Sequence, residues 1–221
     1  ISASSQSGIR ITSRYRIGHT LSDSLCFMSR IASTVPPEGA IIPERHPKAP
    51  PVGSKIPSHF GHCFGCGELH PTGLHLVAYA GEGADITAQF TVTENHQGAP
   101  GLAHGGLLSL AFDEALGKLM WLLRAPAVTA RLETDFLKPV PMGSTLHITA
   151  KITGQVNRKV YSSAEGRLNT PDGPLAVRAA ALFVIVPMDH FLNNAPKEYL
   201  DHISKSPEIL AFVDPDFEIN P

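Results

Sequence analysis

The sequence predicts an α+β domain in which an antiparallel sheet wraps around one long buried helix. Two observations lead to this prediction. The stretch Leu107–Leu123 has the length of a helix and is apolar on nearly every face. Two strand-like runs precede it and four β-rich runs follow it, with turn residues at the breaks. One helix followed by a meander of long strands favours an antiparallel sheet packed on that helix.

The elements follow from local patterns of apolar and turn-forming residues. Two strands are expected before the helix, joined by a turn at Gly81–Gly83, at Leu74–Tyr79 and Ala84–Val92. Four strands are expected after it, at Val128–Leu137, Thr145–Val156, Val160–Leu168 and Leu175–Val186. The breaks between them fall at Pro139–Gly143, Gln155–Arg158 and Pro171–Gly173. A short helix is expected around Lys197–Ser204.

Three segments are distinguished by composition. Residues 1–57 form a leader rich in Pro, Ser and Arg that we expect to be poorly ordered, residues 58–187 form the folded domain, and residues 188–221 form a C-terminal extension. The first part of the leader has several arginines and a single acid, Asp23, a composition that resembles an organellar transit peptide. A second interpretation takes Met28 as the start of the protein.

The overall composition excludes several classes of protein. A chain of 221 residues that is 43% hydrophobic can bury a substantial core. A net charge of −2 provides no basic surface for nucleic acid or an acidic membrane. No apolar run is long and clean enough to span a bilayer. The three cysteines are an odd number, which indicates a reducing compartment, and we expect a cytoplasmic protein.

The most informative segment is His96–Gly106, a loop rich in Gly and Pro that leads into the predicted helix. It places His104 and two glycines at the start of the helix, where free N–H groups and the positive end of the helix dipole stabilise an oxygen that gains negative charge. Within the apolar helix lies Asp113, and a buried carboxylate suggests a function. Ordinary loop chemistry and a structural acid remain as alternatives. Glu114 lies about 100° further round the helix, and spacing does not decide which acid faces a site.

The spacing of these groups points to an oligomer. Gly105 and Asp113 are eight positions apart, which is about 12 Å along a regular helix. That distance is too long for both to contact one reacting carbonyl. If both act on the same bond, Asp113 comes from a second copy of the chain, and the active site lies at a homodimer interface.

These residues resemble a known family. The segment His96–Gly106 followed by Asp113 is similar to the PaaI-type acyl-CoA thioesterases of the 4-hydroxybenzoyl-CoA thioesterase superfamily, and most similar to the long-chain "thioesterase superfamily member" subgroup. Val128–Arg131 and Phe136–Pro139 also resemble the strand after the helix in that family. The resemblance covers about residues 60–186 and implies the hotdog fold.

The resemblance implies a role for each matching residue. Gly105 would supply the N–H that binds the thioester oxygen, and His104 would orient or polarise the carbonyl. Asp113 would act as a general base on water or as a nucleophile, and Thr129 would place a hydroxyl beside it. Gly98 stands where several relatives have Asn. The chemistry requires no metal and no cofactor apart from the CoA of the substrate.

Thr129 has a competing interpretation. It alternates along its strand with three polar residues, a pattern that also fits an outer face of the sheet: Arg131, Glu133 and Asp135.

The predicted function is hydrolysis of a fatty or aryl acyl-CoA to the free acid and CoA by a dimer or a dimer of dimers. The acyl chain is expected to follow the helix past Leu107, Leu108 and Ala111. The alternatives are a hotdog enoyl-CoA hydratase or dehydratase, and a sensor that binds acyl-CoA without turnover. Three cationic residues and one amide near the pocket would bind the CoA phosphates, or would be solvated surface groups: Lys138, Asn157, Arg158 and Lys159.

A short segment combines two cysteines in a Cys-x-x-Cys spacing with three histidines: His59, His62, Cys63, Cys66 and His70. It contains enough ligands for a tetrahedral zinc ion. Structural zinc sites usually draw a second pair of ligands from a distant knuckle, and the sequence has no later Cys pair. We therefore interpret the segment as a packed turn, with a zinc site and a redox dithiol as alternatives.

Overall fold

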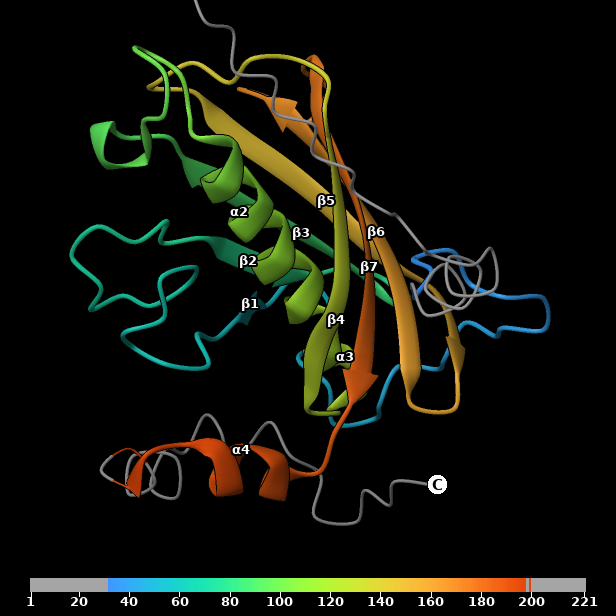
Figure 1. Ribbon diagram of the computed structural model, residues 1–221. Helices are drawn as coiled ribbons and strands as arrows, with labels where there is room; N and C mark the ends of the chain where they lie inside the picture. Colours follow the sequence, from blue (N-terminus) through green and yellow to red (C-terminus); the bar gives the residue numbers. More distant parts are fainter. Residues whose placement is uncertain (1–31, 198, 200–221) are drawn as a thin grey trace, which may run out of the picture. The chain divides into compact units, whose positions relative to one another are not determined.

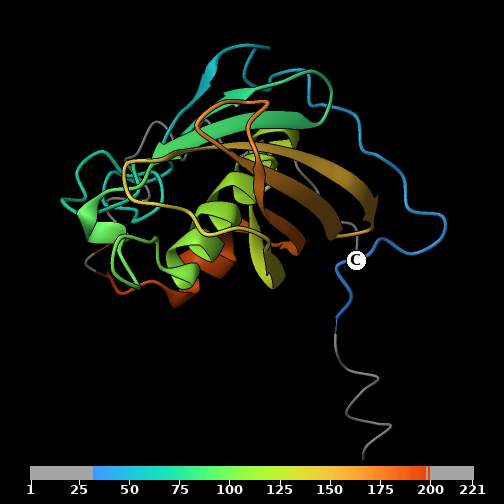
Figure 2. The same cartoon turned by 90° about the horizontal axis from the view of Figure 1, so that it is seen from above.

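The protein is described by a computed structural model that covers residues 32–197 and 199. One antiparallel sheet carries the fold, and helix α2 lies across one of its faces (Figures 1 and 2). The strands are β1 (Lys55–Ile56), β2 (Val77–Ala80), β3 (Asp85–Thr91), β4 (Ala127–Phe136), β5 (Thr145–Val156), β6 (Lys159–Leu168) and β7 (Leu175–Ile185). The helices are the 3-10 turn η1 (Glu94–His96), α2 (Gly105–Lys118), α3 (Met120–Leu123) and α4 (Met188–Asn194).

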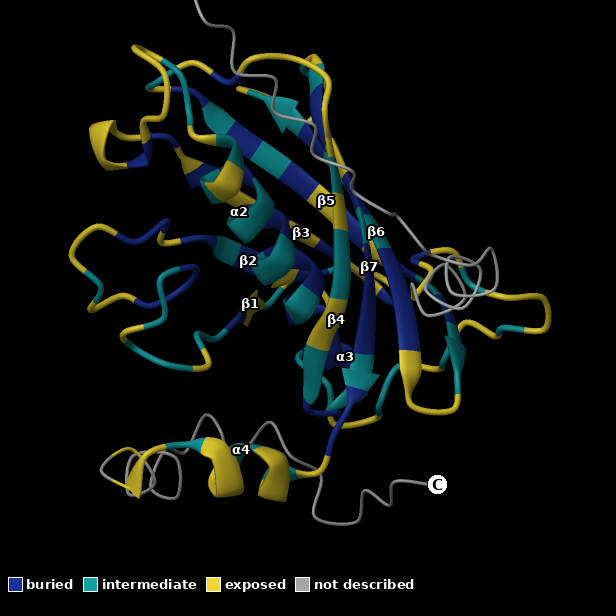
Figure 3. Ribbon diagram, viewed as in Figure 1, coloured by how far each residue is buried: buried dark blue, intermediate teal, exposed yellow. Residues whose placement is uncertain are grey.

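The strand order is β1-β2-β3-β5-β6-β7-β4, with every neighbouring pair antiparallel. Helix α2 packs against β3, β5, β6, β7 and β4. Buried and exposed residues alternate along β3 and along most of β5, because one face of the sheet meets the helix (Figure 3). A sheet wrapped around one long helix is the hotdog fold, so the α+β prediction is confirmed.

Helix α2 packs on the sheet through one stripe of apolar residues. Leu108, Phe112 and Leu116 are among the buried residues of that stripe, at helical spacing. A Cβ at Gly166 of β6 would lie 2.7 Å from Cζ of Phe112, so the absence of a side chain there allows the close approach. Leu107, Leu110 and Asp113 are only half-buried. The expectation of a helix buried on all sides is therefore wrong for this outer stripe.

Several element boundaries differ from the expectation. Strand β2 begins at Val77 rather than Leu74, because His75 adopts a left-handed backbone conformation with φ 49° that bends the chain before the strand. The expected helix to Leu123 divides at Leu119 into α2 and α3, and α3 ends at Arg124, where φ is 50°. The helix expected around Lys197–Ser204 lies outside the described residues except at 197 and 199. No helix in the described ranges is long and apolar enough to cross a membrane.

The described part of the predicted leader, residues 32–57, contacts the sheet. Its residues Lys55 and Ile56 form strand β1 beside β2. Ile41 forms a β-bridge with Gln155 of β5. The guanidinium of Arg45 donates a hydrogen bond to the carbonyl of Gly81 at 2.6 Å. This half of the leader is therefore tied to the domain by backbone and side-chain bonds, and the division of the chain at residues 57 and 187 stays a prediction.

Candidate active site

A compact loop delivers the chain to the start of helix α2. Gln97 and Ala103 form a β-bridge, and between them Gly101 has φ 76°, in the left-handed region that favours glycine. The backbone N–H of His104 donates to the carbonyl of the buried His96 at 2.8 Å. A Cβ at Gly98 would lie 2.8 Å from Cα of His104, so the loop has no room for a side chain at this position.

His104 is the N-cap of α2. Its Nδ1 accepts a hydrogen bond from the N–H of Gly106 at 2.9 Å. In the neutral ring the proton is therefore on Nε2, which can donate to a substrate. Among the described residues, the N–H of Gly105 donates no hydrogen bond. The helix start thus presents one free backbone donor beside an exposed imidazole, as an oxyanion-binding site requires.

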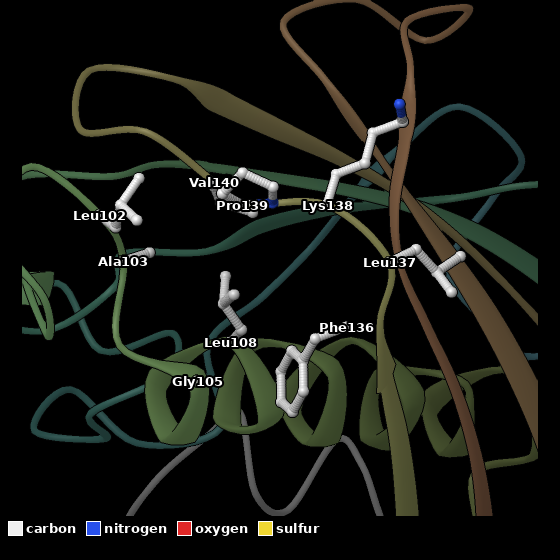
Figure 4. A pocket seen from close by; sticks show the side chains of 9 residues that line it. All are labelled: Leu102, Ala103, Gly105, Leu108, Phe136, Leu137, Lys138, Pro139 and Val140. Carbon is white, nitrogen blue, oxygen red and sulfur yellow. The ribbon is translucent and has the colours of Figure 1, made fainter.

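Gly105 lines a cavity of about 270 Å³ between the start of α2 and the chain that follows β4 (Figure 4). Its remaining lining residues are mostly apolar: Leu102, Ala103, Leu108, Phe136, Leu137, Lys138, Pro139 and Val140. Of the three residues expected to line the acyl channel, Leu108 lines this cavity and Leu107 does not. Ala111 is 0% exposed and belongs to the core beneath the helix.

Asp113 and Thr129 meet beside the second half of helix α2. The hydroxyl of Thr129 donates a hydrogen bond to Oδ1 of Asp113 at 2.8 Å. Thr129 can face the helix because a β-bulge shifts the register of β4 between Thr129 and Arg131. The outer-face interpretation of Thr129 is therefore wrong, since the bulge breaks the alternation on which it depended.

The two halves of the predicted site are separated within one chain. Gly105 and Asp113 are both on α2, so about 12 Å of helix lies between them. Glu114 points elsewhere: its Oε1 lies 3.2 Å from Nζ of Lys118 and 3.8 Å from Nδ1 of His59. The two neighbouring acids therefore have different surroundings: Asp113 lies on the side of Thr129, and Glu114 lies on the side of the Cys-x-x-Cys segment.

The candidate CoA-binding residues lie in two places. Lys138 lines the cavity beside Gly105, and its side chain extends away from the helix (Figure 4). Asn157, Arg158 and Lys159 lie at the exposed turn between β5 and β6, where the carbonyl of Arg158 accepts from the N–H of Ile185 at 2.8 Å. Phe136, two residues before Lys138, pairs with Val177, which is at the opposite end of β7 from Ile185. The turn and Lys138 are therefore about 26 Å apart along the sheet.

The Cys-x-x-Cys segment forms a second cluster of polar side chains. The sequence analysis identified three of its four members. Donor atoms of His59, Cys63, Cys66 and Glu114 all lie within 4.8 Å of one another. His62 and His70 are outside the cluster, and their rings pack against Phe60 and Phe64 instead. Glu114 was missed as a member of this group because it is 48 positions after Cys66 and reaches the loop only through the fold.

The side chains of this cluster shift one another's pKa values. The hydrogen bond from Cys63 lowers the pKa of Cys66 and raises the pKa of Cys63. Burial raises the pKa of Glu114. Burial alone would lower the pKa of His59, but its hydrogen bond and charge interaction with Cys66 outweigh that effect and raise it.

The chain was compared with known proteins. Residues 100–171 match the family model described as the thioesterase superfamily. Acyl-coenzyme A thioesterase THEM4 of Xenopus laevis is 33% identical over 88 residues, which are 40% of this chain and 39% of that protein. THEM4 of Bos taurus is also 33% identical over 88 residues, which are 35% of its length. The solved structure of the E. coli PaaI protein, from the phenylacetic acid degradation operon, is similar with a TM-score of 0.48 and 20% identity, over 52% of this chain and 81% of that one.

The sheet, the central helix and the helix-start site define a hotdog-fold domain. Residues 100–171 of this domain match the thioesterase superfamily model, in agreement with the resemblance predicted from the sequence. The chain spans less than two fifths of the length of the curated relatives named above, 39% of one and 35% of the other.

Proposed function

We propose that this protein is an acyl-CoA thioesterase that hydrolyses a fatty or aryl acyl-CoA to the free acid and CoA. The observation that carries the proposal is the free N–H of Gly105, which lines an apolar cavity at the positive end of a helix. The relatives named acyl-coenzyme A thioesterase support the same chemistry. We propose the cytoplasm as its location, which the two free cysteines in the described residues favour.

In the proposed reaction, the thioester carbonyl binds with its oxygen at the N–H of Gly105, and Nε2 of His104 donates a second hydrogen bond. The Asp113 carboxylate removes a proton from water, and the water oxygen attacks the carbonyl carbon; alternatively, Asp113 itself attacks and water hydrolyses the resulting anhydride. The tetrahedral intermediate collapses with loss of the CoA thiolate, which takes up a proton. Apolar residues such as Leu108 and Phe136 favour an aliphatic acyl group.

The proposed site combines two copies of the chain. Asp113 would come from the subunit opposite the one that supplies Gly105, because one helix separates the two by about 12 Å. Such a homodimer, alone or as a dimer of dimers, would bring residues 157–159 of one subunit towards the cavity of the other. We propose that Lys138, Asn157, Arg158 and Lys159 bind the CoA phosphates in this way.

The test is release of free thiol, followed with a thiol-reactive dye, over acyl-CoA substrates from acetyl to palmitoyl and benzoyl. A blank without substrate corrects for the protein's own cysteines. Replacing Asp113 by Asn should lower kcat by about 10²–10⁴-fold, since a general base is lost. Asp135→Asn, at an exposed carboxylate on β4, is the matched control and should keep wild-type turnover.

The outcomes separate the alternatives. Hydrolysis that is unchanged in Asp113→Asn would remove Asp113 from the mechanism. Hydration of a crotonyl thioester without thiol release would identify a hydratase. Tight binding of acyl-CoA without any turnover would identify a sensor.

A further inference from the structure

The Cys-x-x-Cys cluster lies where Glu114 of α2 meets the loop at residues 58–67. Sγ of Cys63 lies 3.4 Å from Oε2 of Glu114, and Sγ of Cys66 lies 3.4 Å from Nδ1 of His59. Nδ1 of His59 lies 3.8 Å from Oε1 of Glu114. Each of the four side chains therefore offers one sulfur, nitrogen or oxygen atom to a common cluster.

These separations are those of a tetrahedral zinc site. With zinc bonds of about 2.3 Å to sulfur and about 2.0–2.2 Å to nitrogen or oxygen, tetrahedral ligand atoms are about 3.3–3.8 Å apart. The two distances to sulfur, both 3.4 Å, fall in that range, and the 3.8 Å between Nδ1 of His59 and Oε1 of Glu114 is slightly longer than the roughly 3.6 Å upper end for a nitrogen–oxygen pair. All four donor atoms lie within 4.8 Å of one another, so the remaining pairs need only small side-chain rotations to close the tetrahedron.

The charges around the cluster also fit a divalent cation. Two thiolates and one carboxylate carry three negative charges, and Lys118 contributes one positive charge. The Lys118 side chain is 2% exposed, with Nζ bonded to Glu114 and, at 2.9 Å, to the carbonyl of Pro57. With His59 neutral, a divalent ion would bring the net charge of these groups to zero. Buried charges are tolerated when they are balanced in this way.

Backbone hydrogen bonds and two glycines hold the shape of the loop. The N–H of Gly67 donates to the carbonyl of Cys63, and that of Leu69 to Gly61, both at 2.8 Å. A Cβ at Gly67 would lie 2.4 Å from the carbonyl oxygen of Gly61, and one at Gly65 would lie 2.4 Å from Oε2 of Glu114. Both positions therefore exclude side chains, and Gly65 lets the loop approach the carboxylate.

We propose that His59, Cys63, Cys66 and Glu114 bind one zinc ion with tetrahedral geometry. With four protein ligands the site is closed, so its role is structural: it ties the loop to α2 one residue from Asp113. The thiol protons are released to solvent when the ion binds. The half-exposed His59 side chain gives the ion an entry path. This proposal replaces the interpretation of the segment as a packed turn without metal, because Glu114 supplies the ligand that the sequence lacked.

The test begins with the full chain, stripped of metal by a chelator under reducing conditions and then titrated with Zn²⁺ or Co²⁺. We expect about one zinc ion per chain by elemental analysis, the stoichiometry of a single closed site. Co²⁺ should give a thiolate-to-cobalt charge-transfer band and the intense visible bands of a tetrahedral complex. Chelation should lower Tm, since the ion binds only the folded loop.

Variants assign the ligands. Cys66→Ser should weaken zinc binding and reduce the charge-transfer band, because only the Cys63 thiolate remains. Glu114→Gln, which keeps the side-chain size, should weaken zinc binding by more than about tenfold, a loss that even indirect partners of a metal site can cause. His62→Ala removes a neighbouring histidine outside the cluster and should keep stoichiometry and affinity. Circular dichroism verifies that each variant is folded.

Three results would overturn the proposal. One is the absence of zinc and cobalt binding by the reduced, folded wild-type chain, a measurement that depends on no variant. Another is zinc that binds equally well to Cys66→Ser and to wild type, which would place the ion elsewhere. The third is a Cys63–Cys66 disulfide that persists in the purified protein under mild reductant, which would identify the cluster as a redox dithiol.

Discussion

The start of α2 shows how few atoms the proposed chemistry requires. His104 uses its Nδ1 to cap the N–H of Gly106, which holds the ring in place and leaves Nε2 as the donor. Gly105 keeps its own N–H free, and that donor needs no reorganisation when negative charge develops on a bound oxygen. The test is therefore to remove the backbone N–H of Gly105.

Gly105→Pro should lower kcat by about 10²–10³-fold, the usual cost of losing one oxyanion donor. Proline is tolerated at the first position of a helix, and His104, with φ −72° and ψ 131°, already has the extended backbone that precedes a proline. The fold should therefore survive, and steady-state thiol release is the measurement.

The matched control is Gly105→Ala, which keeps the N–H. Its Cβ would lie 3.5 Å from Cζ of Phe136, an ordinary contact. Alanine should therefore cost far less turnover than proline. Equal losses in the two variants would mean that the cavity shape matters and the N–H does not.

In strand β4, one irregularity determines which side chains reach the helix. The bulge between Thr129 and Arg131 reverses the direction of the side chains: Thr129 pairs with Phe183, and Arg131 pairs with Leu182. Thr129 thus faces Asp113, while Arg131 lies on the opposite face with Glu133, to which it is bonded at 2.7 Å. An extra residue in the strand aims the hydroxyl at the carboxylate.

Thr129→Val should reduce kcat by about 10–100-fold, which corresponds to the 1.5–3 kcal/mol of a hydrogen bond to a charged group. Valine keeps the shape of the side chain and the strand propensity. Thr134→Val, at a half-buried threonine of the same strand, serves as the control. Equal turnover in Thr129→Val and wild type would show that Thr129 does not position Asp113.

At the scale of the molecule, the described residues leave a partly exposed surface along α2 and β4. Strand β4 is at the edge of the sheet in the described chain, and unpaired edges are covered or paired in most proteins. Phe136 and Leu137 at its end are 53% and 48% exposed. Together with the half-buried outer stripe of α2, this surface suits the second copy of the chain that the proposed shared site needs.

A mixing experiment tests the shared site. Asp113→Asn and Gly105→Pro chains, each with little activity, should regain activity when co-expressed, because one site of each mixed dimer is intact. Random mixing makes half the dimers mixed, so roughly one quarter of wild-type turnover is expected. Mixed dimers that form, as shown by mass spectrometry, yet remain inactive would place both groups of the site in one chain.

The features of the fold and of the site that could be predicted from the sequence are those that depend on residues close together in the chain. The long apolar run of α2, the strand-like runs of the sheet and the glycine-rich helix start depend on residues close in sequence, and all were identified within a few positions. Boundaries failed where one residue adopted an unusual backbone, as at His75 and Arg124, whose φ values are 49° and 50°.

The remaining features depend on contacts between residues far apart in the chain. The residues alone predicted the fold class, the helix-start donor and an acid within α2. They did not choose between Asp113 and Glu114, because adjacent side chains on a helix diverge by about 100° and only the surrounding elements show what each one meets. The β4 bulge and the Cys-x-x-Cys loop supply those surroundings: Thr129 lies 16 positions from Asp113, and Cys63 lies 51 positions from Glu114.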